Sequence, residues 1–222
     1  MVIAILGGTG QQGGGLALRW ALKGHEIIIG SRQAARAQAA AEELKRRLAG
    51  SGSVRGATNR EAAQAAQIVV LAVPPAGQVA TAEEVRNSLP GKILVDVTVA
   101  LDPRALDCVR LPNGESAVVA LQRRLGSGVR VVSAFQNVAA LHLEDPGHEV
   151  DCDVLVCSDD NAARETVVAL AADVGLRAWH AGPLANSVAA EALTSVLISI
   201  NKRYKIRASG LRITGVPGKD ER

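Results

Sequence analysis

The sequence predicts an α/β fold of the Rossmann type, in which a doubly wound and mostly parallel sheet is followed by a small, largely helical C-terminal domain. Short apolar runs rich in β-branched residues alternate with longer segments rich in Ala, Leu and Arg, the pattern of strands separated by helices. Such alternation favours a parallel sheet. The first apolar run also passes directly into a glycine-rich turn, and 48% of the 222 residues are hydrophobic, enough for a sizeable core.

Six strands with intervening helices are expected in the first two thirds of the chain. The expected strands are residues 2–6, 26–29, a short one near 54, 68–73, 93–98 and 129–135. The expected helices are residues 14–23, 34–48, 60–66, 77–89 and 115–125. Pro74 and Pro75 end the most apolar strand, because residues without amide hydrogens cannot continue the ladder.

The alternation loosens after residue 135. Residues 136–151 contain Pro146 and are expected to form a connection across the surface or into a cleft. A strand, a helix and a strand follow at 154–157, 161–174 and 176–180. After Gly182-Pro183, a long apolar helix is expected over residues 186–201.

The glycine-rich string Gly8-Thr9-Gly10-Gln11-Gln12-Gly13 follows the first strand and opens the first helix. Its spacing, G-x-G-x-x-G, is that of the dinucleotide fingerprint. We expect Gly8 to allow the tight turn, Gly10 to let a pyrophosphate approach the backbone, and Gly13 to let helix and strand pack closely. The free amides and positive dipole end of the first helical turn would hold the phosphate oxygens. A glycine turn without a ligand is the alternative.

The end of the second strand selects between the two nicotinamide cofactors. An acid there would bind the ribose 2′-hydroxyl of NAD, but the strand ends in Ser31 and Arg32, with Arg36 one helical turn further on. A hydroxyl and two guanidinium groups suit the 2′-phosphate of NADP. Solvated arginines at a helix start are the alternative, which is disfavoured because cations are poorly placed at a helix N-terminus.

Other strand ends should complete the site, because ligands of open α/β sheets lie outside the carboxyl ends of the strands. These ends are Val73-Pro74, Thr98 and Ala134. Val73 and Pro74 would form an apolar wall against the nicotinamide half of the cofactor. A plain strand terminus is the alternative reading of each.

Composition excludes several classes of function. The formal charge of +3 suits an anionic small molecule, whereas the scarcity of aromatic residues argues against a nucleic-acid surface. The histidines lack metal-ligand spacing, so no metal site is expected, and Cys108, Cys152 and Cys157 are interpreted as buried free thiols. No signal peptide and no uninterrupted apolar run of about 18 residues is found, so we expect a cytoplasmic protein without a membrane partner.

The chain also resembles a known family. The string ILGGTGQQGGGLALRWALKGHEIIIGSR is similar to the NADPH:F420 oxidoreductases, also called F420-dependent NADP reductases. The resemblance continues with VVSAF at 131–135, DVLVCSDD at 153–160 and AGPLANS at 181–187. The same nucleotide domain occurs in membrane metalloreductases, but those proteins add transmembrane helices.

The resemblance implies reversible hydride transfer between NADP(H) and the deazaflavin coenzyme F420. It places residues 9–12 at the pyrophosphate and Ser31, Arg32 and Arg36 at the 2′-phosphate. It places around the nicotinamide and its ribose Val73, Pro74, Val79, Thr98 and Ala134. The amide side chains of Gln136 and Asn137 are candidates to hydrogen-bond a carbonyl of the deazaflavin. No catalytic acid or base is expected, because the hydride passes directly between two stacked rings.

Residues 1–150 are expected to form the NADP-binding domain and residues 151–222 a small domain that closes the deazaflavin cleft. The helix at 186–201 would close that cleft, form the surface of a homodimer, or be plain core. The basic segment 202–207, with Arg212, would meet the phosphate and glutamate tail of the coenzyme, cover a partner subunit, or be a solvated terminus.

Two other classes of function remain open at this point. One is another NADPH-dependent reductase, acting on a flavin, a ferric chelate, an imine or a ketone. The other is a non-catalytic NADP-sensing regulator. No Lys or Tyr stands out as the proton donor that an imine or ketone reductase needs, and no DNA-reading helix or partner-binding extension stands out for a regulator.

Overall fold

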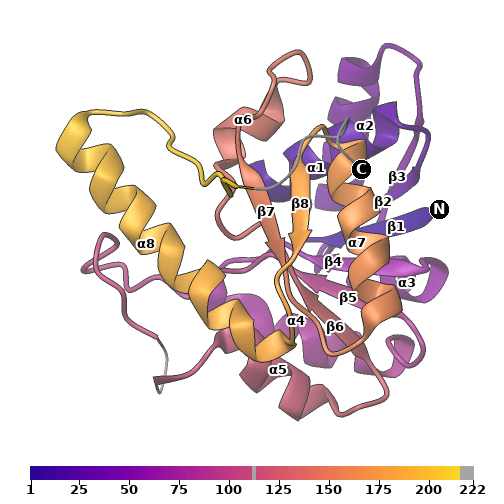
Figure 1. The fold of residues 1–222 in the computed structure, drawn as a ribbon. Coiled ribbons are helices and arrows are strands. Elements are labelled where there is room, and N and C mark those ends of the chain that lie inside the picture. The colour runs from indigo at the N-terminus through magenta and orange to yellow at the C-terminus, as the bar shows by residue number, and fades with distance from the viewer. Residues whose placement is uncertain (112–113, 216–222) are drawn as a thin grey trace.

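The computed structural model describes residues 1–111 and 114–215 and shows a six-stranded parallel sheet with helices on both faces (Figure 1). The strand order is β3-β2-β1-β4-β5-β6. The chain adds β2 and β3 on one side of β1 and then β4 to β6 on the other side, as in doubly wound nucleotide-binding folds. The strands are β1 (Val2–Leu6), β2 (Glu26–Ser31), β3 (Ser53–Thr58), β4 (Ile68–Leu71), β5 (Ile93–Asp96) and β6 (Arg130–Ser133). The predicted fold class is confirmed.

Two apolar layers sandwich the sheet because successive strand side chains point to opposite faces. The helices are α1 (Gln11–Leu22), α2 (Ala34–Leu48), α3 (Asn59–Ala65), α4 (Gln78–Glu84), α5 (Ala117–Leu125), α6 (Ala140–Glu144), α7 (Asn161–Asp173) and α8 (Ser187–Tyr204). Ile3 and Ile5 pack with α1, α2 and α7, whereas Ala4 and Leu6 pack with α3, α4 and α5.

Several predicted boundaries were wrong. The single helix expected at 77–89 is instead a 3-10 turn (Pro75–Gly77), α4 and a second 3-10 turn (Arg86–Ser88). The expected connection at 136–151 contains α6, which packs on α1 so closely that a Cβ atom at Gly15 would lie 2.5 Å from Leu143 Cβ. The expected burial of Cys108 was also wrong, because its side chain is exposed; Cys152 and Cys157 are buried and free.

The C-terminal part adds a parallel pair of strands, β7 (Asp153–Val156) and β8 (Arg177–His180), connected by α7. An antiparallel bridge between Ser133 and Cys157 joins this pair to the edge of the main sheet. One hydrophobic core extends from Ile3 to Leu176, so it crosses the predicted domain boundary at residue 150, and that division remains a prediction. Helix α8 then runs along the outside of the molecule, away from the main sheet (Figure 1).

Candidate functional site

The turn between β1 and α1 brings backbone close to neighbouring elements. Gly7 has a φ angle of +80°, and a Cβ atom there would lie 2.4 Å from the Ala72 carbonyl oxygen. A Cβ atom at Gly13 would lie 2.9 Å from Gly8 Cα, so Gly13 does serve close packing, as expected. The left-handed residue of the turn is Gly7, which directly follows β1. Gly8, expected to allow the tight turn, is also confined, because a Cβ atom there would lie 3.0 Å from the Ile5 carbonyl oxygen.

Gly10 differs from these glycines. A Cβ atom at Gly10 would meet only the Gly7 carbonyl oxygen, at an ordinary distance of 3.6 Å. The surrounding described protein therefore does not require glycine here, whereas a ligand that contacts the backbone would. Gly10 is also the N-cap of α1 and offers no side-chain acceptor, and the first turn of α1 contains no acid. This helix end is suited to an anion.

An open pocket of about 770 Å³ lies beside the turn, at the carboxyl ends of β1, β2 and β4. It is lined by Gly7, Thr9, Gly10, Ser31, Arg32, Gln33, Arg36, Asn59, Ala72, Val73, Pro74 and Thr81. The pocket thus brings together the predicted pyrophosphate residues Thr9 and Gly10, the predicted 2′-phosphate group and the apolar wall at Val73. Sequence reasoning missed Asn59 and Thr81, because each becomes part of the site only through helix packing.

Within residues 1–111 and 114–215, the arginines of this pocket have no counter-charge from the protein. Arg32 and Arg36 are exposed, and neither forms an ion pair with any residue in the described ranges. Helix α2, which begins beside them, has no acid in its first turn. The Ser31 hydroxyl accepts from the Gln33 amide at 3.3 Å and retains its own hydrogen to donate. Two cations and a donor at a helix N-terminus form a site for a dianion.

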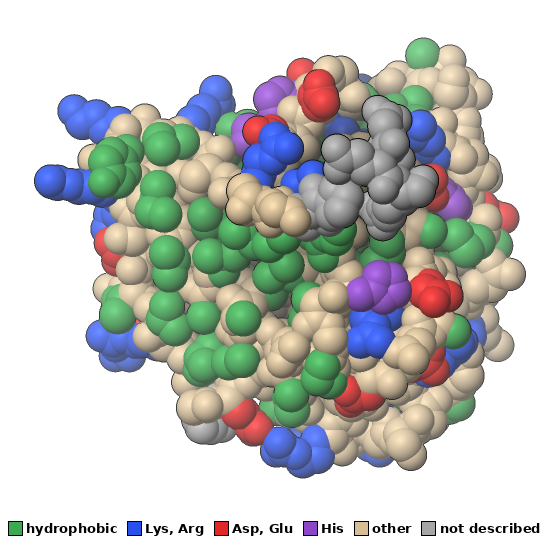
Figure 2. All heavy atoms as spheres, in the orientation of Figure 1, with side chains coloured by type: hydrophobic (Ala, Val, Ile, Leu, Met, Phe, Trp, Pro, Cys, Tyr) green, Lys and Arg blue, Asp and Glu red, His purple; other side chains and the backbone are tan. Residues whose placement is uncertain are grey.

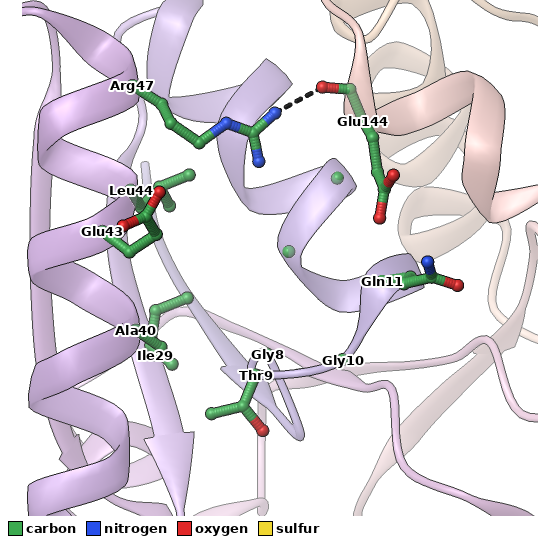
Figure 3. Close-up of a pocket in the computed structure, with 12 residues that line it drawn as sticks. Gly8, Thr9, Gly10, Gln11, Ile29, Ala40, Glu43, Leu44, Arg47 and Glu144 are labelled. Carbon is green, nitrogen blue, oxygen red and sulfur yellow. Dashed lines mark hydrogen bonds between the residues drawn. The ribbon is translucent and has the colours of Figure 1, made fainter.

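A smaller pocket of about 300 Å³ lies on the other side of the turn, between α1, α2 and α6 (Figure 3). Gly8 and Gln11 line it, together with the carboxylate-bearing residues Glu43 and Glu144. Arg47 donates to the Glu144 carbonyl oxygen across it. Two acids and one cation line this pocket, whereas two arginines and no acid line the larger pocket, which is therefore the better anion site.

The remaining residues predicted at the nicotinamide and the deazaflavin lie in the segments that follow β4, β5 and β6, and all but Val79 are buried. Thr98 and Ala134 are buried, and Val79 on α4 is 40% exposed. Gln12 donates to the Phe135 carbonyl oxygen at 3.3 Å, which connects the glycine turn to the end of β6. The expected nicotinamide residues therefore gather on one edge of the sheet, next to the 770 Å³ pocket but not all lining it.

Gln136 and Asn137 are 4% and 3% exposed, respectively, and their amide nitrogens are already bonded. Gln136 donates to the Asp96 carbonyl oxygen at 2.8 Å and Asn137 to the Asp153 carbonyl oxygen at 2.7 Å. Both amide oxygens lack a hydrogen-bond partner among the described residues. The side-chain atoms left without a partner are therefore buried acceptors, which pair with an N–H group and not with a carbonyl.

Sequence reasoning also missed an acid at the end of β5. Asp96 is fully buried and accepts from the side chain of Gln78, and burial raises its pKa to about 6. The available signal was a single acid that ends the apolar run ILVD, which is equally typical of an ordinary strand terminus.

Comparison with known proteins identifies the family. Residues 2–100 match the model of the coenzyme F420-dependent NADP oxidoreductases. The chain is 42% identical to the F420-dependent NADP reductase of Methanothermobacter marburgensis, covering 98% of this chain and 100% of the relative. It is 40% identical to the reductase of the same name from Methanocaldococcus jannaschii, covering 97% and 99%.

Solved structures agree with these relatives. A crystal structure of a candidate F420-dependent NADP reductase from Arthrobacter sp. FB24 superimposes with a TM-score of 0.79 at 28% identity, covering 96% of this chain and 98% of that one. Full-length identity of about 40% to named reductases confirms the resemblance found in the sequence. The chain therefore belongs to the family of F420-dependent NADP reductases.

Proposed function

We propose that this protein transfers a hydride reversibly between NADP(H), bound beside the glycine turn, and coenzyme F420. The observation that carries the proposal is the group of Ser31, Arg32 and Arg36 in the pocket next to the fingerprint turn, whose two guanidinium groups form no ion pair within the described residues. NADP differs from NAD by its 2′-phosphate, and such a group of residues binds this dianion. The family relatives, which are named for both cofactors, support the second half of the exchange.

The proposed site has four parts along one edge of the sheet. Residues 8–13 hold the pyrophosphate, and Ser31, Arg32 and Arg36 hold the 2′-phosphate. The nicotinamide and its ribose lie among Val73, Pro74, Val79, Thr98 and Ala134. The free amide oxygens of Gln136 and Asn137 accept from the deazaflavin. The protein's contribution is to hold two rings face to face and exclude water, without a catalytic acid or base.

The direct test mixes purified protein with NADPH and oxidised F420 and follows the deazaflavin absorbance. We expect its loss to match NADPH oxidation mole for mole. NADPH binding, measured separately by calorimetry, is the control. Intact NADPH binding without turnover would contradict the deazaflavin assignment and leave the nucleotide site in place.

We also propose that the protein is a cytoplasmic homodimer whose C-terminal part, residues 151–222, closes the deazaflavin cleft. Figure 2 shows hydrophobic side chains gathered on the side where α8 lies in Figure 1. Residues Ala189, Ala192, Val196 and Ile200 form a helically spaced stripe that is at least partly exposed.

The segment Leu184–Tyr204 is long and apolar enough, by length and composition alone, to cross a membrane. It also contains the buried acid Glu191, and a second copy of the chain is the occupant that we propose for its exposed face.

Val196→Glu should therefore dissociate the dimer, raising its dissociation constant at least about 30-fold, because a charge would be buried at the centre of the stripe. Val196 is 43% exposed, so the folded monomer should tolerate the change. Sedimentation velocity measures the outcome. Leu22→Glu, at a similarly exposed position on α1 (45%), is the matched control and should remain dimeric. A monomeric parent protein, or an unaffected variant, would refute this interface.

The basic segment 202–207 begins in the last turn of α8. The basic residues are partly engaged within the chain, since Lys202 pairs with Asp107 at 2.6 Å and Arg212 pairs with Asp151. Residues 216–222 lie outside the described residues. Arg203 and Arg207 are exposed and remain the proposed contacts for the anionic tail of the coenzyme.

A further inference from the structure

Asp96 connects the three segments that follow β4, β5 and β6. Its Oδ1 atom accepts from the Thr98 amide at 2.8 Å, and its Oδ2 atom accepts from Gln78 Nε2 at 2.5 Å. Its carbonyl oxygen accepts from Gln136 Nε2 at 2.8 Å and from the Ala134 amide at 3.3 Å. A single fully buried residue therefore fixes the ends of three neighbouring strands relative to one another.

These three segments carry the proposed nicotinamide wall. Val79 is the neighbour of Gln78 on α4, Thr98 is bonded to the Asp96 side chain, and Ala134 is bonded to its backbone. The Asp96 carboxylate is thus bonded to the segments that carry this wall, but it is fully buried and is not among the residues that line the 770 Å³ pocket.

The carboxylate lacks a cationic partner among the groups that the structure places around it. Its side-chain donors, Gln78 and Thr98, are neutral, and so are Leu71 and Ser133, which flank it in register on β4 and β6. The charged group that acts on it is Glu191 on α8, a second acid. Burial is the main cause that raises the pKa of Asp96 to about 6, with Glu191 raising it further. Asp96 is thus ionised at pH 8 and neutral at pH 5.

A buried carboxylate without a cation is unfavourable for folding, and such groups beside a cleft are candidates for function. The chemistry of the proposed reaction supplies a cation. When the hydride leaves C4 of the dihydronicotinamide with its bonding pair, the ring becomes positively charged. The acceptor gains that hydride and takes a proton from solvent. A fixed negative charge in a low-dielectric wall would stabilise the oxidised ring relative to the reduced one.

We propose that Asp96 is a positioning residue whose ionised carboxylate, held behind Thr98 and Ala134, is the counter-charge of the oxidised nicotinamide ring. The inference rests on the proposed NADP(H) site, and it adds a residue that controls the balance between NADP⁺ and NADPH on the protein. It does not depend on the identity of the hydride acceptor.

The test compares the affinities for NADP⁺ and NADPH by calorimetry at pH 8 and pH 5. In the parent protein, the preference for NADP⁺ over NADPH should fall about tenfold as the pH drops and Asp96 becomes neutral. The 2′-phosphate also titrates near this range, but it is common to both ligands and cancels in the ratio. In Asp96→Asn, the ratio at pH 8 should already equal that of the parent protein at pH 5. The amide can keep both hydrogen bonds if the Gln78 amide rotates by half a turn.

Three further variants identify the titrating group. Gln78→Leu removes a hydrogen-bond donor to the ionised Asp96 carboxylate, so the pH at which the affinity ratio changes should become higher. Glu191→Gln removes the neighbouring acid, so the change should persist and move to lower pH. Asp153→Asn is the matched control, because Asp153 is also buried but is paired with Arg177 on β8. The pH dependence of the ratio should be unchanged in this variant.

Each result decides the inference. A ratio in the parent protein that is constant between pH 5 and pH 8 would overturn it even if Asp96→Asn did not fold. Equal ratios in the parent protein and a folded Asp96→Asn at pH 8 would also overturn it. A pH-dependent ratio without F420 turnover would support Asp96 and contradict only the deazaflavin assignment. Absence of NADP(H) binding would contradict both the proposed function and the role of Asp96.

Discussion

The double substitution Arg32→Ala and Arg36→Ala should raise the dissociation constant for NADPH at least about 100-fold, with little change for NADH. Each guanidinium is exposed, lines the pocket beside the turn and forms no ion pair within the described chain. Hydrogen bonds to a charged group contribute about 1.5–3 kcal/mol each, and two such groups act on the same dianion. NADH lacks that dianion, so its binding should change by no more than about twofold.

The control for this prediction is Lys45→Ala with Arg46→Ala, on the last turn of the same helix. It removes the same net charge, but its two residues pair locally with Glu42 and Glu43. Calorimetric titration with both cofactors at two salt concentrations distinguishes a local contact from general attraction. If the Arg32 and Arg36 variant weakened NADH as strongly as NADPH, the 2′-phosphate assignment would be wrong.

The fold was predictable from sequence because its signals are local. Five of the six strands of the main sheet are short apolar runs beside a helix, and the right-handed crossover rule leaves few ways to connect them. The exception is the edge strand β3, whose sequence SVRGAT is largely polar. The glycine turn and the Ser31-Arg32 pair were found for the same reason, since their residues are contiguous and can be recognised without knowing the tertiary structure. The strand before Pro74 and Pro75 was predicted, but its end was not, because β4 ends at Leu71 and not at Val73.

The remaining features depend on contacts between distant residues. Asp96 ends an apolar strand, and nothing in its neighbourhood in sequence shows that Gln78 and Gln136 enclose it. Helix α6 occupies only five residues, too few for a helical period to be recognised, and it exists because Gly15 leaves room for Leu143 against α1. The stretch 136–151 therefore resembled a connection until its packing was known.

Of the substitutions considered, the one at Arg19 should lower the free energy of unfolding most. It is 7% exposed, lies on α1, and donates to carbonyl oxygens from two other parts of the chain. The acceptors are Leu143 at 3.2 Å, Val174 at 2.9 Å, His142 at 2.8 Å, Asp145 at 2.6 Å and His148 at 2.9 Å. Burial lowers the pKa of Arg19, with Asp145 acting in the opposite direction. One side chain thus holds α6, the segment after it and the end of α7 against the helix that carries the glycine turn.

We expect Arg19→Leu to lower the free energy of unfolding by about 3–5 kcal/mol, measured by urea denaturation, because the carbonyl groups lose a shared charged donor while remaining largely buried. The free energy of unfolding of Arg19→Lys should lie between those of the parent protein and Arg19→Leu, since an ammonium has three donors in place of five. Arg124→Leu is the control on α5, where a half-exposed arginine pairs with Glu83 at 2.6 Å and contributes at most about 1 kcal/mol. Hydrogen exchange adds a local readout, because amides in residues 142–148 should lose protection before those of β1. If Arg19→Leu were no more destabilising than Arg124→Leu, α6 would have to be held on α1 by apolar packing at Leu143 alone.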